Sequence, residues 1–174
     1  MPSPVFHLAA GAATAHVLGK TRAPGANSWR FRLVCLACSM LPDLDAVPGI
    51  LLNRMADFHN NISHSPAFGL AACLLLSPVL MRLLPGWRWQ PVMALSCGSY
   101  LLHVAFDWMT YGRGVMLGWP LTDERFHAPF NVFRGVRWSE GLISPEHLPT
   151  LANEVGVMLL LALLYLGARR VSAR

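Results

Sequence analysis

Histidines and aspartates recur beside apolar runs at four separated places in the chain, and these residue types together can bind a metal. The four places are His7, the pair Asp43 and Asp45 in LPDLD, the pair His59 and His64 in HNNISHS, and the pair His103 and Asp107 in HVAFD. Imidazoles and carboxylates are ligands of zinc and of harder transition metals. Because ionisable residues at membrane depth are costly and usually functional, the pattern indicates a metal site at a membrane surface, and such a site suggests hydrolysis.

The HVAFD motif has a spacing that suits a metal. His103 and Asp107 are four residues apart, so they share one face of a predicted helix. The two side chains would then be ligands of one ion, or the aspartate would orient a ligating histidine. A buried His–Asp hydrogen bond that only joins helices would use the same spacing, and the motif alone leaves both interpretations open.

The LPDLD motif places two acids directly after an apolar run. Pro42 disfavours helix at Leu41, so we expect the chain to break there. In a broken backbone Asp43 and Asp45 can turn toward one site, although they are two residues apart. The alternative is an N-cap for the short helix that follows, but two acids at this position favour a site.

The HNNISHS motif carries two histidines around a turn. His59 and His64 are five residues apart and do not share a helix face, while Ser65 and Pro66 have the types of an N-cap and a first helical residue. His64 would therefore be held rigidly at a helix start. Taken singly, these would be solvated loop histidines. His7 would join the site if its apolar segment packs beside HVAFD, and a surface histidine is the alternative.

The composition is that of an integral membrane protein. The chain has 174 residues, of which 54% are hydrophobic and 13% charged, where ordinary soluble domains are about 25% charged. Five apolar segments stand out, at about residues 4–19, 31–41, 66–84, 91–111 and 151–168. A full span needs about 20 residues, so the first two are short. We expect one all-α domain over residues 1–174, a membrane-embedded bundle of about five spans with a long outer loop at 112–150.

Basic residues beside the apolar segments predict the orientation. Nine lie on one side and five on the other. The nine are Lys20, Arg22, Arg30, Arg32, Arg82, Arg88, Arg169, Arg170 and Arg174, and the five are Arg54, Arg113, Arg125, Arg134 and Arg137. Because basic residues favour the cytoplasmic side, we expect a cytoplasmic C-terminus, with residues 42–65 and 112–150 outside. All four motifs then meet at the outer face.

The outer loop also carries residues that suit a substrate. Arg113 and Arg125 would bind a phosphate or carboxylate near the metal, and solvated arginines are the alternative. Trp119 belongs to a group of aromatic residues that would form an interfacial belt or line an acyl-chain groove. The group consists of Trp108, Tyr111, Trp119 and Trp138.

Other function classes fit the sequence less well. The net charge is +5, but the basic residues form no stripe, so we expect no nucleic-acid binding. HExxH and GxSxG motifs are absent from the sequence, which disfavours a zincin protease and a serine esterase. All four cysteines lie inside apolar runs, where we interpret them as packing residues. We assign His16, which has no acidic neighbour, to packing too.

These motifs, in this order, resemble the YdjM-like family of predicted inner-membrane metal-dependent hydrolases. The resemblance covers about residues 1–126 and includes Trp119-Pro120 after HVAFD. It implies a multi-pass protein of the bacterial inner (cytoplasmic) membrane, and with the orientation predicted from the basic residues the active site would face the periplasm. The family's middle motif usually resembles HRGxTHS, whereas this chain has HNNISHS. If the missing basic residue holds phosphate in the family, another arginine must do so here.

The chain is also distantly similar to zinc-dependent phospholipase C and P1-type nucleases, which are all-helical and use clustered His and Asp. There too an aspartate precedes a histidine by fourteen positions, as Asp45 precedes His59, and an HxxxD pair follows. This similarity implies that Asp45, His59, His103 and Asp107 hold one Zn²⁺. It further implies that His7 reaches a second ion bridged by Asp107, within a total of one to three ions.

We therefore predict a membrane-bound metal-dependent hydrolase. Its expected substrate is a lipid or lipid-linked phosphoester at the outer membrane–water interface. The expected site comprises catalytic Asp43, Asp45 and His64, metal ligands His7, Asp45, His59, His103 and Asp107, and substrate-binding Arg113, Arg125 and Trp119. An unligated Asp43 or Asp45 would be the general base. An ester or amide substrate stays open. The alternatives are a non-enzymatic metal-binding or metal-transporting protein, and a structural protein whose His–Asp pairs join helices.

Overall fold

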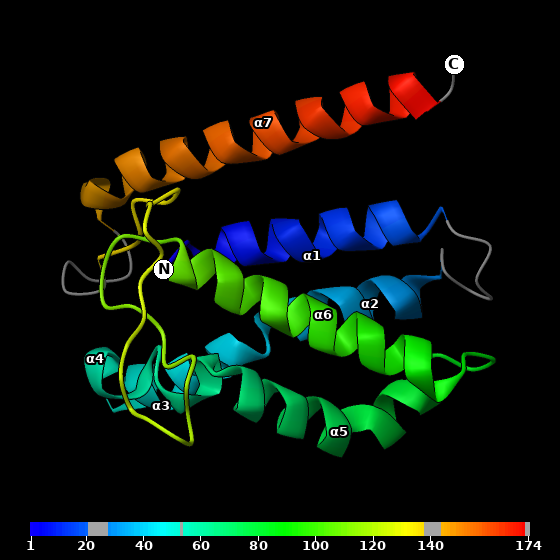
Figure 1. The fold of residues 1–174 in the computed structure, drawn as a ribbon, viewed down its shortest axis with the longest axis horizontal. Helices are drawn as coiled ribbons and strands as arrows, with labels where there is room; N and C mark the ends of the chain where they lie inside the picture. Colours follow the sequence, from blue (N-terminus) through cyan, green and yellow to red (C-terminus); the bar gives the residue numbers. More distant parts are fainter. Residues whose placement is uncertain (21–27, 53, 138–143, 173–174) are drawn as a thin grey trace.

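The computed structural model describes residues 1–20, 28–52, 54–137 and 144–172, and its regular secondary structure in these ranges is helical (Figure 1). The long helices are α1 (Pro4–Leu18), α2 (Trp29–Met40), α5 (Pro66–Leu83), α6 (Trp89–Trp108) and α7 (Leu148–Ser172). The short elements are η1 (Pro42–Asp45), α3 (Ala46–Leu51), α4 (Met55–Phe58), η2 (Ile62–His64) and η4 (Pro145–His147). The predicted all-α fold is confirmed.

Serine caps fix where three of the long helices begin. The hydroxyls of Ser3, Ser28 and Ser65 each accept a hydrogen bond, at 3.2 Å, from the backbone N–H three residues further on. Pro4 and Pro66 then occupy the first helical turn, where a missing N–H costs nothing. The predicted Ser65-Pro66 helix start is therefore confirmed.

The long helices run back and forth, so distant segments meet at one end of the bundle. α1 packs on α2, α2 packs on α6, and α5 packs on α6. The start of α1, the ends of α2 and α6, and the start of α5 lie together on the left of Figure 1. Cys35, Cys38 and Cys73 are buried in the apolar core between these helices, which confirms their interpretation as packing residues.

The predicted break after Leu41 is also confirmed. α2 ends at Met40 and the turn η1 follows, so that α2 and the segment Pro42–Leu51 are bent by 56°. The segment leaves Leu44, Val47, Ile50 and Leu51 exposed. Exposed apolar side chains at this bend suit contact with a lipid surface.

Within the described residues, two helical segments are long and apolar enough to cross a membrane. They are α5 and the 27 residues Pro145–Val171, and α2 with its bent continuation would make a third. α1 is apolar but has 15 residues. The number of about five spans stays a prediction, because α1 and α6 would have to cross as well.

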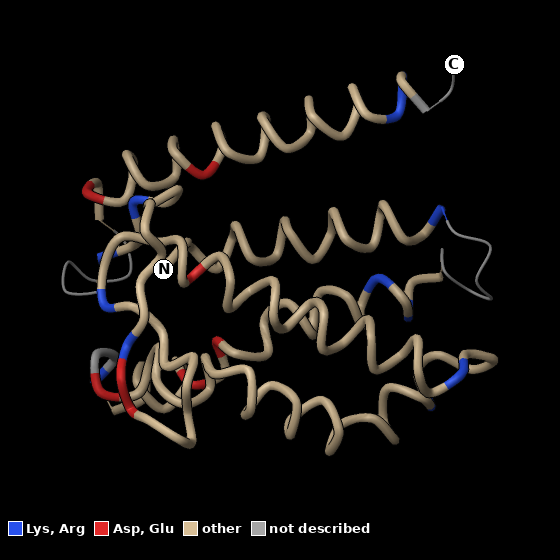
Figure 2. The backbone as a smooth tube through the Cα atoms, viewed as in Figure 1, with Lys and Arg blue, Asp and Glu red and all other residues tan. Residues whose placement is uncertain are grey.

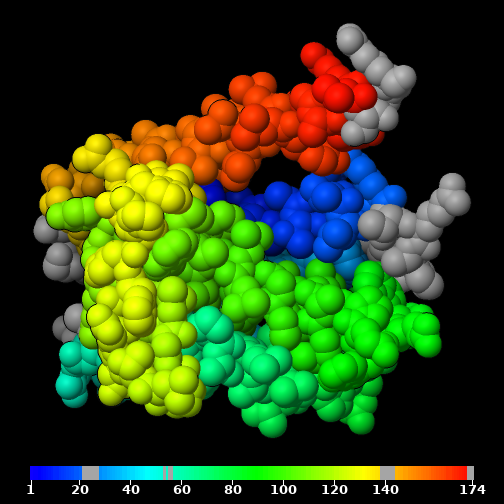
Figure 3. All heavy atoms as spheres, in the orientation of Figure 1, coloured from blue at the N-terminus to red at the C-terminus, as the bar shows by residue number. Residues whose placement is uncertain are grey.

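The predicted outer loop folds back over the end of the bundle where the motifs meet. Val115 and Phe126 exchange backbone hydrogen bonds at 3.1 and 2.9 Å, and Tyr111 N–H donates to the carbonyl of Phe133. Figure 3 shows this loop, in yellow, covering that end of the molecule. The predicted loop boundary at residue 150 was too late, because α7 begins at Leu148. Trp138 lies outside the described residues.

Among the described residues, acidic and basic side chains share one end of the bundle, whereas the other end carries basic side chains (Figure 2). Acidic residues lie at the end that carries the loop, together with the arginines of the loop, and the far ends of the helices carry Lys and Arg. Glu154 is buried and accepts hydrogen bonds at 2.5 Å from the Ser3 N–H and hydroxyl. These bonds join α7 to α1 near the loop.

Single-cysteine labelling tests which end faces outward. Glu124 lies exposed in the loop and Gln90 lies exposed at the other end of the bundle. In a Cys97→Ser background, whose remaining cysteines are buried, we expect Glu124→Cys to react with an impermeant maleimide in cells whose outer membrane is permeabilised. Gln90→Cys should react only after the inner membrane is opened. The reverse pattern would place the loop in the cytoplasm.

Candidate metal centre

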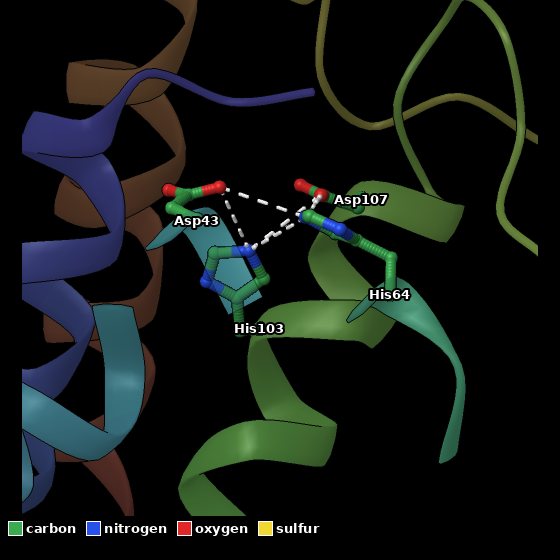
Figure 4. Close-up of side chains that lie close together, drawn as sticks. All are labelled: Asp43, His64, His103 and Asp107. Atoms are coloured by element: carbon green, nitrogen blue, oxygen red, sulfur yellow. Dashed lines mark hydrogen bonds and ion pairs between the residues drawn. The ribbon is translucent and has the colours of Figure 1, made fainter. Parts of the chain in front are cut away.

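Three of the sequence motifs converge on one buried group of side chains (Figure 4). Asp43 comes from η1, His64 from η2, and His103 and Asp107 from the last turns of α6. All four are buried, and one ligand-type atom from each lies within 4.8 Å of the others. The helical spacing of HVAFD and the break in LPDLD therefore bring nitrogen and oxygen ligands to one point.

The two histidines of this group present the same ring nitrogen to the two carboxylates. His64 Nε2 lies 3.0 Å from Asp107 Oδ2 and 3.6 Å from Asp43 Oδ1. His103 Nε2 lies 3.4 Å from Asp43 Oδ1 and 3.6 Å from Asp107 Oδ2. The four atoms therefore surround one small volume, into which both imidazoles point.

The other nitrogen of each ring is held by a different part of the chain. His103 Nδ1 donates to the backbone carbonyl of Ser39 at 2.7 Å. His64 Nδ1 lies 3.0 Å from Ser63 Oγ and 3.3 Å from Asp45 Oδ2. A proton kept on Nδ1 leaves the Nε2 lone pair for a metal and fixes the orientation of the ring.

Asp45 orients histidines and does not cap a helix. Its Oδ1 lies 2.6 Å from His59 Nδ1, and its Oδ2 accepts the Asn60 N–H at 3.0 Å and the Ser63 hydroxyl. It stands at the N-cap position of α3 without a capping hydrogen bond. Since both oxygens are occupied by HNNISHS, Asp45 joins LPDLD to that motif.

His59 lies beside the buried group. With its Nδ1 bound to Asp45, its Nε2 lies 3.9 Å from Asp43 Oδ1 and contacts the Met1 thioether. Asp45, His59 and His64 form a second group of ligand-type atoms that shares His64 with the first. The implied ligand set of Asp45 and His59 with HVAFD thus lies nearby, but Asp43 and His64 are the residues that form one group of ligand-type atoms with His103 and Asp107.

His7 reaches the site from α1. Its Nε2 lies 3.2 Å from Asp107 Oδ1, and its ring stacks on that of His103 with centroids 3.6 Å apart. His7 is fully buried. All four predicted motifs therefore meet at this end of the bundle. His127 and His147 are in neither ligand-type group among the described residues, and His16 is exposed at the other end, so its assignment to packing was wrong.

The centre has the electrostatics of a cation site. Within the described residues, all four carboxylate oxygens of Asp43 and Asp107 are buried without a hydrogen-bond donor in suitable geometry. Such groups are costly unless a charge or a metal compensates them. Burial lowers the pKa of His64, but Asp107, Asp43 and Asp45 outweigh it and raise the pKa well above its usual value. Two imidazoles and two carboxylates fit zinc or a similar divalent ion.

The loop arginines lie on the HNNISHS segment. Arg125 donates to the Asn60 carbonyl at 2.7 Å and to Asn61 Oδ1 at 2.5 Å, and Arg113 approaches the His59 carbonyl at 3.5 Å. Burial, and then the charge of Arg113, lower the pKa of Arg125. The two guanidinium groups are therefore close enough to repel each other, beside the backbone that carries the histidines.

Trp119 lies apart from the ligand atoms. It is partly buried, and its ring meets Phe68, in the first turn of α5, edge-on with centroids 6.5 Å apart. Its assignment to substrate binding stays a prediction. Three further residues of the site were not predicted: Ser39 and Ser63 bind the rings of His103 and His64, and Asn60 binds Asp45. A backbone carbonyl such as that of Ser39 leaves no signal in the spacing of side chains.

Comparison with known proteins identifies one family. A family model described as YdjM inner membrane protein matches residues 1–174. Neither the curated proteins nor the solved structures contain a match.

Loss of the buried ligands should remove the ion. We expect purified protein to contain zinc or a similar divalent metal, and the double variant His103→Ala/Asp107→Ala to contain none, because half of the donor atoms are gone. Asp57→Asn is the control, since Asp57 is exposed and pairs with Arg54. Elemental analysis after dialysis measures both. A double variant with the metal content of the wild type would place the ion elsewhere.

Asp43 and Asp45 should respond differently to the same substitution. Asp43→Asn removes a carboxylate from the buried group, so we expect metal binding to be lost. Asp45→Asn weakens the hold on His59 and His64 without removing an atom from that group, so affinity should fall about 10–100-fold. Competition titrations with a chelating dye measure both. Equal losses would mean that Asp45 is itself a ligand.

Proposed function

The chain belongs to the YdjM inner membrane protein family, and from this premise we propose that it is a membrane-bound metal-dependent hydrolase. Its proposed substrate is a lipid or lipid-linked phosphoester at the membrane–water interface. One observation carries the proposal: the buried carboxylates of Asp43 and Asp107 lie within 3.0–3.6 Å of the Nε2 atoms of His64 and His103 at one end of an apolar bundle.

Asp43, His64, His103 and Asp107 would hold the ion. When bound, a divalent ion supplies Lewis acidity, which polarises the scissile bond and activates water. The chain itself orients the ligands of this ion, because Ser39 and Asp45 fix the rings of His103 and His64. An ordered ligand set of this kind is prepared before substrate binds, so little reorganisation is needed during the reaction.

His59 is the side chain best placed to move a proton. Its Nδ1 is bound to Asp45, so its Nε2 can accept a proton while the carboxylate stabilises the resulting imidazolium. It lies at the edge of the buried group, 3.9 Å from Asp43 Oδ1. Asp45 would thus act through His59, whereas the sequence alone favoured Asp43 or Asp45 as the base.

The two loop arginines favour a phosphate. An anion between Arg113 and Arg125 would relieve the repulsion that contributes to the lowered pKa of Arg125. Arg125 already binds Asn60 and Asn61, so it positions the loop. Arg113 is exposed and is the better candidate to bind the phosphate. It would replace the basic residue that HNNISHS lacks.

Exposed apolar residues beside the centre favour a lipid. Leu44 separates the two aspartates of LPDLD in the chain and is 58% exposed, and Leu51 at the end of α3 is 78% exposed. Leu121 in the covering loop is 94% exposed. These side chains would enter the interfacial region around the site, so a substrate could reach the ion without leaving the membrane.

A metal-binding or metal-transporting protein is the second candidate. The buried centre alone would serve that function as well as catalysis. Transporters commonly bind their substrates near the midplane, between repeated halves, whereas this centre lies at one end of the bundle. The arginines and exposed leucines beside it add features that transport of a cation does not require.

Turnover separates the two candidates. We expect metal-loaded protein in detergent or vesicles to hydrolyse a phospholipid or an isoprenyl phosphate. His59→Ala should reduce kcat while the ion stays bound, because His59 lies outside the four closest ligands. If fully loaded wild type cleaves nothing in a screen of phosphoesters, esters and amides, the binding or transport function is favoured instead.

The arginines should affect substrate capture without affecting the ion. We expect Arg113→Gln to raise KM about 10- to 100-fold, the value of a charge-assisted hydrogen bond, with metal content unchanged. Arg134→Gln is the matched control, because Arg134 is another exposed arginine of the same loop. An Arg113→Gln variant with wild-type KM, or a control with the same defect, would contradict this role.

A further inference from the structure

A second cavity lies at the opposite end of the bundle, between α1 and α2. Its volume is about 450 Å³, within the range of about 300–1,000 Å³ that is usual for ligand sites. Its lining residues are Ala12, Ala15, His16, Gly19, Lys20, Arg32 and Leu36. We call it the α1–α2 groove. None of these residues belongs to the metal centre.

The α1–α2 groove has an apolar part and a basic end. Ala12 and Ala15 of α1 and Leu36 of α2 line its apolar part. The short side chains of the two alanines leave the space open. Lys20 follows the end of α1, eight residues after Ala12, and also lines the groove. Arg32, in the first turn of α2, lines the groove as well. An apolar channel that ends in cations suits an amphiphile with an anionic head.

The charges around the groove are all of one sign. In the part of the chain that the structure describes, this end carries Lys and Arg, and the acidic residues lie toward the metal centre (Figure 2). The cations at this end are Lys20, Arg30, Arg32, Arg82, Arg88, Arg169 and Arg170. A ligand bound here therefore meets no nearby carboxylate, and an anion is the charge that fits.

α7 also reaches the basic end of the groove. Lys20 Nζ donates to the Tyr165 hydroxyl at 3.1 Å, and the Arg169 guanidinium lies 6.0 Å from the centre of the same ring. These contacts join α7 to α1 beside the groove. A ligand at Lys20 would thus lie next to the contact that holds α7 at this end.

We propose that the α1–α2 groove binds an anionic phospholipid of the leaflet at this end. One acyl chain lies along Ala12, Ala15 and Leu36, and the phosphate lies between Lys20 and Arg32. Basic pockets between membrane helices bind anionic headgroups in this way. The proposal does not depend on the hydrolase activity, because the groove and the metal centre lie at opposite ends of the bundle.

Lipid retention tests the basic end. Full-length protein in neutral detergent is mixed with phosphatidylglycerol or phosphatidylcholine of identical acyl chains, and bound lipid is measured by native mass spectrometry. We expect the wild type to retain phosphatidylglycerol, and Lys20→Gln/Arg32→Gln to bind it about 30-fold more weakly. Arg82→Gln/Arg88→Gln is the control, because it removes two exposed arginines at the same end outside the groove.

A second pair of variants tests the apolar part. Ala12→Phe fills the groove without changing its charge, so it should abolish phosphatidylglycerol retention. Ala13→Phe adds the same ring at an exposed neighbour that does not line the groove, and it should retain the lipid. Circular dichroism confirms that each variant is folded.

Several results would overturn the proposal. Equal retention of the two lipids by the wild type would show that the negative charge of the headgroup does not contribute to binding. Wild-type lipid binding by Lys20→Gln/Arg32→Gln, or an equal loss of binding in the Arg82→Gln/Arg88→Gln control, would show that the lipid does not bind in the groove. Inorganic phosphate that displaces the lipid at equal concentration would show an anion site with no use for the acyl chain. None of these results bears on turnover at the metal centre.

Discussion

Two buried carboxylates, those of Asp43 and Asp107, impose the main constraint on this fold, because their charge must be compensated at the end of an apolar bundle. Their oxygens lack hydrogen-bond donors in suitable geometry among the described residues, while imidazole nitrogens surround them. Burying two carboxylates would be costly without a compensating positive charge. The turn after α2 and the helical register of α6 bring the two carboxylates together, so the fold concentrates negative charge that protonated imidazoles or a metal ion would compensate.

The histidines answer this constraint in a consistent way, although each is anchored by a different group. A backbone carbonyl holds His103, and one carboxylate, that of Asp45, holds both His59 and His64. In each case Nδ1 is engaged and Nε2 is directed toward Asp43. Asp45 therefore does as much to build the centre as the residues that would touch an ion.

Much of this could be predicted from local patterns, because local rules determine those parts. The i and i+4 spacing fixed His103 and Asp107 on one face, Pro42 marked the break, and Ser65 with Pro66 marked a helix start. The partner of each residue could not be predicted, because it depends on packing between distant segments. Sequence spacing paired Asp45 with the ligands by analogy, whereas the bent backbone turns Asp43 inward and leaves Asp45 to bind HNNISHS.

HNNISHS has no basic residue of its own, and its polar partners also come from a distant segment of the chain. Asn60 adopts a positive φ of 59°, which asparagine tolerates better than most residues, and its side chain donates to the Gly114 carbonyl at 3.1 Å. Asn61 accepts from Arg125 at 2.5 Å. The two asparagines thus bind a loop more than fifty residues away in the chain, and that loop brings Arg113 and Arg125 to the histidines. A cation that is missing from the local motif is therefore supplied by a distant part of the chain, whose arginines lie beside the HNNISHS backbone.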